Sequence, residues 1–395
     1  MTIFYKHRIM TSSINQIPLF VERIKSLKDT IITNIILTGQ IPAPTFEEGQ
    51  RAEMLLERFS HAGLERCTPD TIGNPVAVLP GRSADKPPIF VVAHLDTVVD
   101  REVDHNYTIT RNSIQGPGIA DNSTGVGVLA SLPDIFAGLG LSFESDIVLA
   151  GVVRSIGDGN LEGIKTLVKN WGTPIRGAIS LEACELGRLS YFSEGLKRCE
   201  IECSISPGLG VKQRFLPNAI LVLNEVINQI LELRLPQRPR ARIIVGRISG
   251  GIKHGTIPFD ASLGLEIQSD SVEMVRSVYA DIKDIVNGVA HEQQAVLKLK
   301  SISEQAPSRL KFSHPLVKSA IAVMKKLKLE PVTVPSESEL SVFLSHNIPA
   351  ITLGLTHGTD AFLPEHSTVK ISPLFKGIAQ VIGVLSAIDS GVCDE

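Results

Sequence analysis

The chain has 395 residues, of which 43% are hydrophobic and 21% are charged, and its formal net charge at pH 7 is −3. This length is typical of about two globular domains with a sizeable core, and the small net charge gives no electrostatic attraction to nucleic acid or to an anionic membrane. The five cysteines are irregularly spaced, which argues against a disulfide framework. The sequence shows no apolar segment typical of a signal peptide and no apolar run near the roughly 20 residues that a membrane span needs. We therefore expect a cytoplasmic protein with reduced thiols.

Two helices are predicted first, over residues 18–37 and 47–62, from apolar residues spaced three and four apart. Short apolar runs without polar alternation follow at residues 89–93, 147–153, 178–181 and 350–353. Such runs are typical of strands buried on both faces of a helix-covered sheet. Helical patterns lie between them, so the predicted fold class is α/β.

The segment of residues 196–305 has a different pattern and is predicted to be an inserted domain. Residues 199–205 and 261–267 alternate between apolar and polar, which indicates an antiparallel sheet with one wet face. Helices fit residues 217–233 and 271–289, so the inserted domain is α+β with the order β-α-β-β-α. Residues 1–195 and 306–395 then form the first domain.

The strongest local signal for chemistry is the tripeptide His94-Leu95-Asp96, which ends the first apolar run. In open α/β sheets, functional groups gather beyond the carboxyl ends of the strands. A histidine there can offer one ring nitrogen to a metal ion, while a carboxylate two residues later orients the ring through its other nitrogen. The alternative is an ordinary loop histidine, because His-x-Asp is a common tripeptide.

A second signal is the glycine- and proline-rich segment of residues 116–122, which ends in Asp121-Asn122 just before a predicted helix. The two oxygens of Asp121 can bridge two metal ions. The alternative is a helix N-cap, where Asp and Asn are favoured in any case.

A third signal is Glu182, which follows the apolar run of residues 178–181. Alone it is better explained as a solvated loop acid. Together with His94 and Asp121, however, it supplies one imidazole and two carboxylates, a set of ligands suited to zinc with an open coordination position.

Several segments carry a resemblance to a known family. They are VVAHLDT (residues 91–97), GPGIADNSTGVGVLA (116–130), IGDGNLEGIK (156–165) and LEACELGRLSYFSEG (181–195). From about residue 47 onward the chain resembles the zinc-dependent exopeptidases and amidohydrolases that include peptidase T, acetylornithine deacetylase and the glutamate-releasing carboxypeptidases, with a tripeptidase or peptidase T-like branch nearest.

The resemblance implies a catalytic domain with a doubly wound mixed sheet and an inserted, ferredoxin-like lid or dimerisation domain. It also implies that His94, Asp121 and Glu182 form one metal site and that Asp96 orients His94. The family's paired glutamates, a general base and a ligand of a second metal, should fall at Ser155 and Ile156. A serine hydroxyl is not basic near neutral pH, and the isoleucine side chain has no lone pair to offer a metal.

The second metal also needs a histidine near the C-terminus, and the matching position holds Phe362. His357 and His366 lie nearby, but neither is in register with the family's motif. The second metal site is therefore predicted to be lost.

Substrate-binding positions of the inserted domain have changed as well. Leu209 stands where the family carries a histidine that polarises the scissile carbonyl. Gly255, beside His254, takes the place of an asparagine, and Gln268 that of an arginine that grips a substrate carboxylate.

The main prediction is therefore a pseudoenzyme that keeps at most one zinc ion, with none as the alternative. It would bind a peptide or small-molecule ligand, or act as a regulatory or scaffolding partner, and could form a homodimer through the inserted domain. The alternative is an active one-metal peptidase or amidohydrolase with a displaced base such as Asp158 or Glu185. The sequence leaves open whether the protein is an enzyme.

Overall fold

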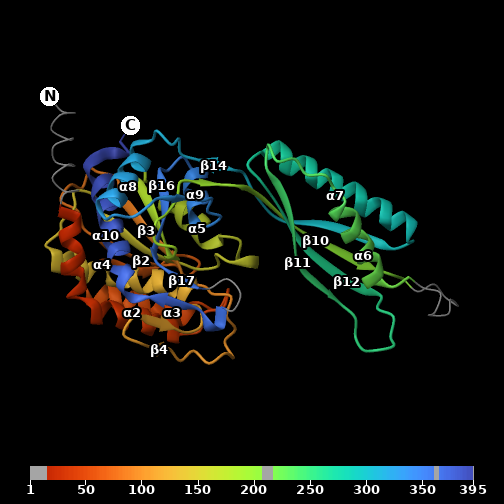
Figure 1. Cartoon of the computed structure of the whole chain (residues 1–395), viewed down its shortest axis with the longest axis horizontal. Helices are drawn as coiled ribbons and strands as arrows, with labels where there is room; N and C mark the ends of the chain where they lie inside the picture. The colour runs from red at the N-terminus through yellow and green to blue at the C-terminus, as the bar shows by residue number, and fades with distance from the viewer. Residues whose placement is uncertain (1–15, 207–216, 360–363, 395) are drawn as a thin grey trace. The chain divides into compact units, whose positions relative to one another are not determined.

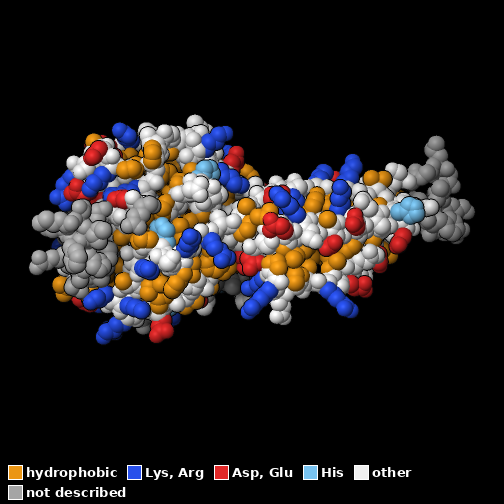
Figure 2. All heavy atoms as spheres, turned by 90° about the horizontal axis from the view of Figure 1, so that it is seen from above, with side chains coloured by type: hydrophobic (Ala, Val, Ile, Leu, Met, Phe, Trp, Pro, Cys, Tyr) orange, Lys and Arg blue, Asp and Glu red, His pale blue; other side chains and the backbone are white. Residues whose placement is uncertain are grey.

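The computed structural model describes residues 16–206, 217–359 and 364–394 of the chain. The chain divides into two compact units, Met1–Phe192 with Arg309–Glu395, and Ser193–Ser308 (Figure 1). The segment predicted as an insertion, residues 196–305, falls within the second unit. Acidic and basic side chains are interspersed on the face shown in Figure 2, in line with the small net charge.

The first unit is built on an eight-stranded mixed sheet with the strand order β1-β2-β6-β3-β7-β16-β8-β15. The four adjacent strands β6, β3, β7 and β16 run parallel, whereas β2 and β8 join them in antiparallel fashion. The strands are β1 (Glu65–Pro69), β2 (Pro75–Leu79), β3 (Ile89–His94), β6 (Ile147–Val152), β7 (Gly177–Cys184), β8 (Arg188–Ser190), β15 (Val332–Thr333) and β16 (Ala350–Thr356). Every residue of β3, β6 and β16 is buried, which explains the unbroken apolar runs.

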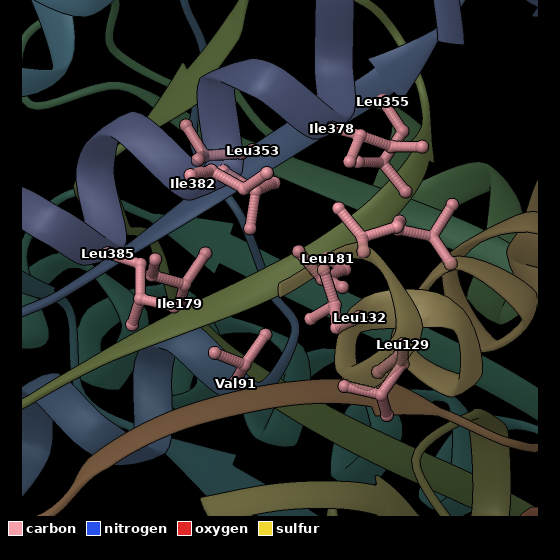
Figure 3. Close-up of a cluster of buried hydrophobic side chains, with 14 of the residues drawn as sticks. Val91, Leu129, Leu132, Ile179, Leu181, Leu353, Leu355, Ile378, Ile382 and Leu385 are labelled. Carbon is pink, nitrogen blue, oxygen red and sulfur yellow. The ribbon is translucent and has the colours of Figure 1, made fainter. Parts of the chain in front are cut away.

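Helices cover both faces of this sheet, so the predicted α/β class is confirmed. One core joins the sheet to α2 (Lys28–Gln40), α3 (Gly49–His61), α4 (Thr124–Leu139), α8 (Pro315–Lys326) and α10 (Ile371–Ala387). A second core joins the opposite face to α5 (Glu162–Trp171) and α9 (Glu339–Ser345). Figure 3 shows Val91, Ile179 and Leu353 of three neighbouring strands meeting leucine and isoleucine side chains of α4 and α10.

The segment of α10 and η5 (Ile388–Val392) is the one helical stretch among the described residues that is long and apolar enough to cross a membrane. Of its most apolar window, 78% is buried inside the protein. Its apolar character therefore follows from its place in the core.

The single helix predicted over residues 18–37 is wrong, because the structure has two helices there. Residues 16–25 are helical, a turn follows at Ser26 and Leu27, and α2 then begins at Lys28. The amides of Ser26 and Leu27 donate to the carbonyls of Arg23 and Ile24, and the Ser26 hydroxyl also donates to Arg23. Apolar spacing continues across this turn, so the sequence pattern gives no sign of the break.

The second unit has a four-stranded antiparallel sheet with the strand order β11-β12-β10-β13, covered by α6 and α7. Its elements are β10 (Gly195–Ser204), α6 (Ala219–Leu231), β11 (Ala241–Gly250), β12 (Asp260–Ser269), α7 (Val272–Glu292) and β13 (Val296–Gln305). The predicted order β-α-β-β-α is thus one strand short. The signal for β13 was present, because Leu297 and Leu299 alternate with lysines.

The remaining strands are short. A small sheet with the order β17-β18-β5-β4 lies in the first unit. These short strands are β4 (Thr108–Ile109), β5 (Ser113–Gln115), β9 (Phe192–Ser193), β14 (Ser308–Arg309), β17 (Gly358–Thr359) and β18 (Thr368–Lys370).

Replacing Leu353 by Ala should destabilise the first unit by about 2–5 kcal/mol, because the side chain is fully buried between β16 and α10. The control is Leu19→Ala, whose side chain is 66% exposed and whose loss should change stability by less than about 0.5 kcal/mol. Chemical denaturation followed by circular dichroism measures both variants. Equal effects of the two substitutions would contradict this assignment of the core.

Candidate metal site

The candidate site lies at the carboxyl end of the parallel strands. His94 is the last residue of β3 and Glu182 lies near the end of β7, and β3 pairs directly with β7. Asp121 comes from the short turn η1 (Ile119–Ser123), which leads into α4. Parallel neighbours end at the same edge of a sheet, so these side chains meet although 88 residues separate the first from the last.

Asn122 fixes the turn that carries Asp121 against strand β7. Its side-chain amide donates to the Leu181 carbonyl at 2.8 Å and its oxygen accepts from the Ala183 amide at 2.9 Å. These two hydrogen bonds flank Glu182 on the strand. The N-cap alternative for Asp121 is wrong, because α4 begins at Thr124 after Ser123 and neither end of the turn has a side-chain cap.

The three predicted ligands form one compact cluster. His94 Nε2 lies 3.1 Å from Asp121 Oδ1 and 3.9 Å from Glu182 Oε2, and one ligand atom from each residue lies within 4.8 Å of the others. Two ligands of a tetrahedral zinc ion, each bound at about 2.0–2.2 Å, are roughly 3.4 Å apart. The cluster therefore fits a zinc ion with small side-chain adjustments.

Asp96 is fully buried behind His94 and is held by the loop that follows β6. Its Oδ2 accepts hydrogen bonds from the amides of Ser155 at 2.9 Å and Ile156 at 2.8 Å, and from the Thr45 hydroxyl at 2.9 Å. Nδ1 of His94 lies 3.1 Å from the Asp96 carbonyl and 3.5 Å from its Oδ1. Both oxygens favour a proton on Nδ1, which leaves Nε2 free to face a metal.

The pKa values within the cluster depend strongly on one another. Burial alone would lower the pKa of His94, but hydrogen bonds to Asp121 and Asp96 and the nearby carboxylate charges raise it well above its usual value. Burial raises the pKa of Glu182 to about 7, against the opposing charges of His94 and Arg188. Desolvation would raise the pKa of Asp121, but the hydrogen bond and charge of His94 lower it overall.

The structure places the remaining predicted positions as follows. Ser155 is buried and Ile156 half-buried after β6, and both face the site through backbone amides that bind Asp96. Asp158, Glu185, His254, Gly255, His357 and His366 are exposed, and Gln268 is buried in β12 beside Glu266. Phe362 and Leu209 lie outside the described residues.

Glu339 is a residue of the site that the sequence analysis missed. It begins α9, is fully buried, and accepts a 2.7 Å hydrogen bond from the Ser155 hydroxyl. In the sequence it looks like an ordinary acid in the first turn of a helix. No local pattern links it to a residue 184 positions away.

Comparison with known proteins agrees with this architecture. Residues 74–197 match the model of peptidase family M28. No curated protein matches the sequence. The fold is similar to aminopeptidase PepT from Bacillus cereus, with a TM-score of 0.70, 17% identity, and coverage of 91% of this chain and 98% of that one.

Two further structures extend the likeness. The dipeptidase Dug1p from Saccharomyces cerevisiae has a TM-score of 0.75 at 13% identity, and 95% of this chain and 99% of that one are covered. A dinuclear metal-binding peptidase of the M20 family from Bacillus subtilis has a TM-score of 0.62 at 14% identity, with 91% and 99% covered. The chain has the fold of the metal-dependent exopeptidases and amidohydrolases. The fold and family resemblance predicted from the sequence motifs are therefore confirmed.

Zinc affinity should fall as the pH is lowered from 8 to 6. Zinc must displace the proton that His94 holds with its raised pKa, and below about pH 7 also the proton on Glu182. Each displaced proton weakens the apparent affinity by about tenfold per pH unit. Competition with a chromogenic chelator at several pH values measures the slope, and a flat profile would contradict this ligand set.

Proposed function

We propose that the protein binds one zinc ion at His94, Asp121 and Glu182 and has lost two-metal peptide hydrolysis. The proposal rests on the loop after β6. Position 155 offers this site a backbone amide and a hydroxyl, and position 156 offers an amide and a hydrocarbon side chain. None of these groups is a base near neutral pH or a usual zinc ligand.

The arrangement of the candidate ligands supports one metal ion per chain. Within the described parts of the chain, His94, Asp121 and Glu182 are the one group of three or more metal-ligating side chains close enough to share an ion. His357 and His366, the nearest histidines to the altered C-terminal motif, are exposed and lie outside this group. The protein would then be a metal-retaining pseudoenzyme that binds a peptide or small amide in the cytoplasm, where its five free cysteines stay reduced.

A second candidate function, slow hydrolysis at a single metal, is favoured by one observation. The Ser155 hydroxyl donates to Glu339, so a carboxyl group lies one hydroxyl away from the position of the missing base. Asp158 and Glu185, the displaced bases suggested by the sequence, are both exposed. Glu339 is therefore the better candidate for a proton acceptor.

Protein purified with zinc present should contain one zinc ion per chain by atomic absorption. His94→Ala should abolish binding, whereas the exposed His61→Ala should bind as the wild type does. Against di- and tripeptides, kcat/KM should lie at least about 10²–10⁴-fold below that of a two-metal peptidase measured in parallel, because the general base is absent. Two tightly bound ions per chain, or comparable turnover, would overturn the proposal.

We further propose that the inserted unit pairs with a second copy of the chain through β11. Among the described strands, β11 lies at one edge of its sheet with β12 as its neighbour, and an edge strand of this kind can pair with a strand of another chain. Val245 and Ile248 share the helix-covered face with Leu265 and Leu263, yet they are 38% and 54% exposed. An antiparallel β11 from a second copy would satisfy the edge and cover these side chains.

The wild type should sediment as a dimer at micromolar concentration, and Ile248→Lys should shift it toward monomer. The matched control is Ile302→Lys on β13, the opposite edge, where the side chain is 45% exposed. This control should leave the dimer intact. A monomeric wild type, or equal disruption by both variants, would rule out β11 as the interface.

A further inference from the structure

Glu339 is a fully buried carboxyl group with hydrogen bonds to two different parts of the first unit. Its Oε1 accepts from Ser155 Oγ at 2.7 Å, and its Oε2 accepts from Ser180 Oγ at 3.2 Å. Both serines are themselves buried. A buried carboxyl group is unfavourable unless its oxygens are satisfied, so these two hydroxyls fix where the side chain can lie.

The Ser180 hydrogen bond attaches Glu339 to the strand that carries a metal ligand. Ser180 and Glu182 are two residues apart on β7, and alternate residues of a strand share a face. The carboxyl group of Glu339 thus lies against the face that presents Glu182. In agreement, burial raises the pKa of Glu182 to about 7, and the charge of Glu339 is among the further contributors.

The Ser155 hydrogen bond attaches Glu339 to a loop whose backbone is bound by side chains at every position. The four successive amides of residues 153–156 donate to Asn74 Oδ1, Glu48 Oε1 and, for the last two, Asp96 Oδ2, at 2.8–2.9 Å. Asn74, Glu48 and Asp96 are all buried. A shift of this loop would therefore move Asp96, and because Asp96 orients the ring of His94, it would also move that ring.

We infer that Glu339 is a positioning residue of the zinc site, an inference that rests on the proposed zinc binding. Through Ser155 it fixes the loop that holds Asp96 behind His94, and through Ser180 it fixes the strand that carries Glu182. Glu339 therefore keeps the distance between two of the three ligands, His94 and Glu182, constant. Partners of this kind around metal ligands, when removed, typically weaken metal binding by about 10–100-fold.

The test is the zinc affinity of Glu339→Ala and Glu339→Gln, measured by chelator competition at one pH and well below the unfolding temperature. Glu339→Ala should weaken binding by about 10–100-fold. Glu339→Gln should recover most of this loss, because its oxygen still accepts from one serine and its amide can donate to the other hydroxyl. Glu194→Gln, another buried glutamate but in the second unit, is the matched control and should bind as the wild type does.

Two further measurements distinguish positioning of the zinc ligands by Glu339 from a general contribution of Glu339 to stability. The visible spectrum of the Co²⁺-substituted protein reports ligand geometry, and it should change in Glu339→Ala but not in Glu194→Gln. The double variant Ser155→Ala/Glu339→Ala should lose no more affinity than Glu339→Ala alone, because one hydrogen bond links the two residues. If Glu339→Ala does not fold, Ser155→Ala and Ser180→Ala each remove one hydrogen bond and should still weaken zinc binding.

Unchanged zinc affinity and an unchanged cobalt spectrum in Glu339→Ala would overturn the inference while leaving the proposed function intact. If Glu339→Ala is unfolded, unchanged zinc affinity and an unchanged cobalt spectrum in Ser155→Ala and Ser180→Ala would overturn the inference instead. A wild type that binds no zinc would instead refute the proposed function, and with it this inference.

Discussion

The carboxylate of Asp96 is the contact on which the site depends. It is fully buried, and three hydrogen bonds to its Oδ2 join the loop after β6 to Thr45 on another segment. Burying an ion costs several kcal/mol unless its oxygens are well satisfied, and these three donors offset that cost. Its other oxygen lies toward His94 at 3.5 Å. One charge thereby joins the ends of two neighbouring strands and orients His94, a candidate metal ligand.

The sheet topology explains why distant residues converge here. Strands β6, β3 and β7 are adjacent and parallel, so the residues after their carboxyl ends share one edge. Each apolar run in the sequence predicts a strand, and the polar residues at the ends of two of these runs, His94 and Glu182, are predicted ligands. For this reason the proximity of His94, Asp121 and Glu182 could be predicted from sequence, because each has a strand or a helix beside it that marks its place.

Other features carried no local signal. Glu339 acts through hydrogen bonds to Ser155 and Ser180, both more than 150 positions away, and nothing in its own neighbourhood indicates them. The turn at Ser26 and Leu27 likewise interrupts no apolar spacing. Strand and helix periodicities record which face is buried. They do not record which buried polar groups meet, because that depends on the order of strands in the finished sheet.

If a second cation has been lost, as we propose, negative charge at the site would be left uncompensated, and the carboxyl groups around the site would reduce this cost in different ways. The Asp121 side chain is 47% exposed, so water can solvate part of its carboxylate. Glu182 is only 13% exposed, and its pKa of about 7 lets it take up a proton when no metal is bound. Glu339 has no access to solvent and is satisfied by two serine hydroxyls. Serine at position 155 thus has a physical role: a glutamate there would place a second carboxyl group against Glu339, whereas the hydroxyl donates to it. The proposed removal of the base and the presence of this buried acid are therefore compatible in one packed site.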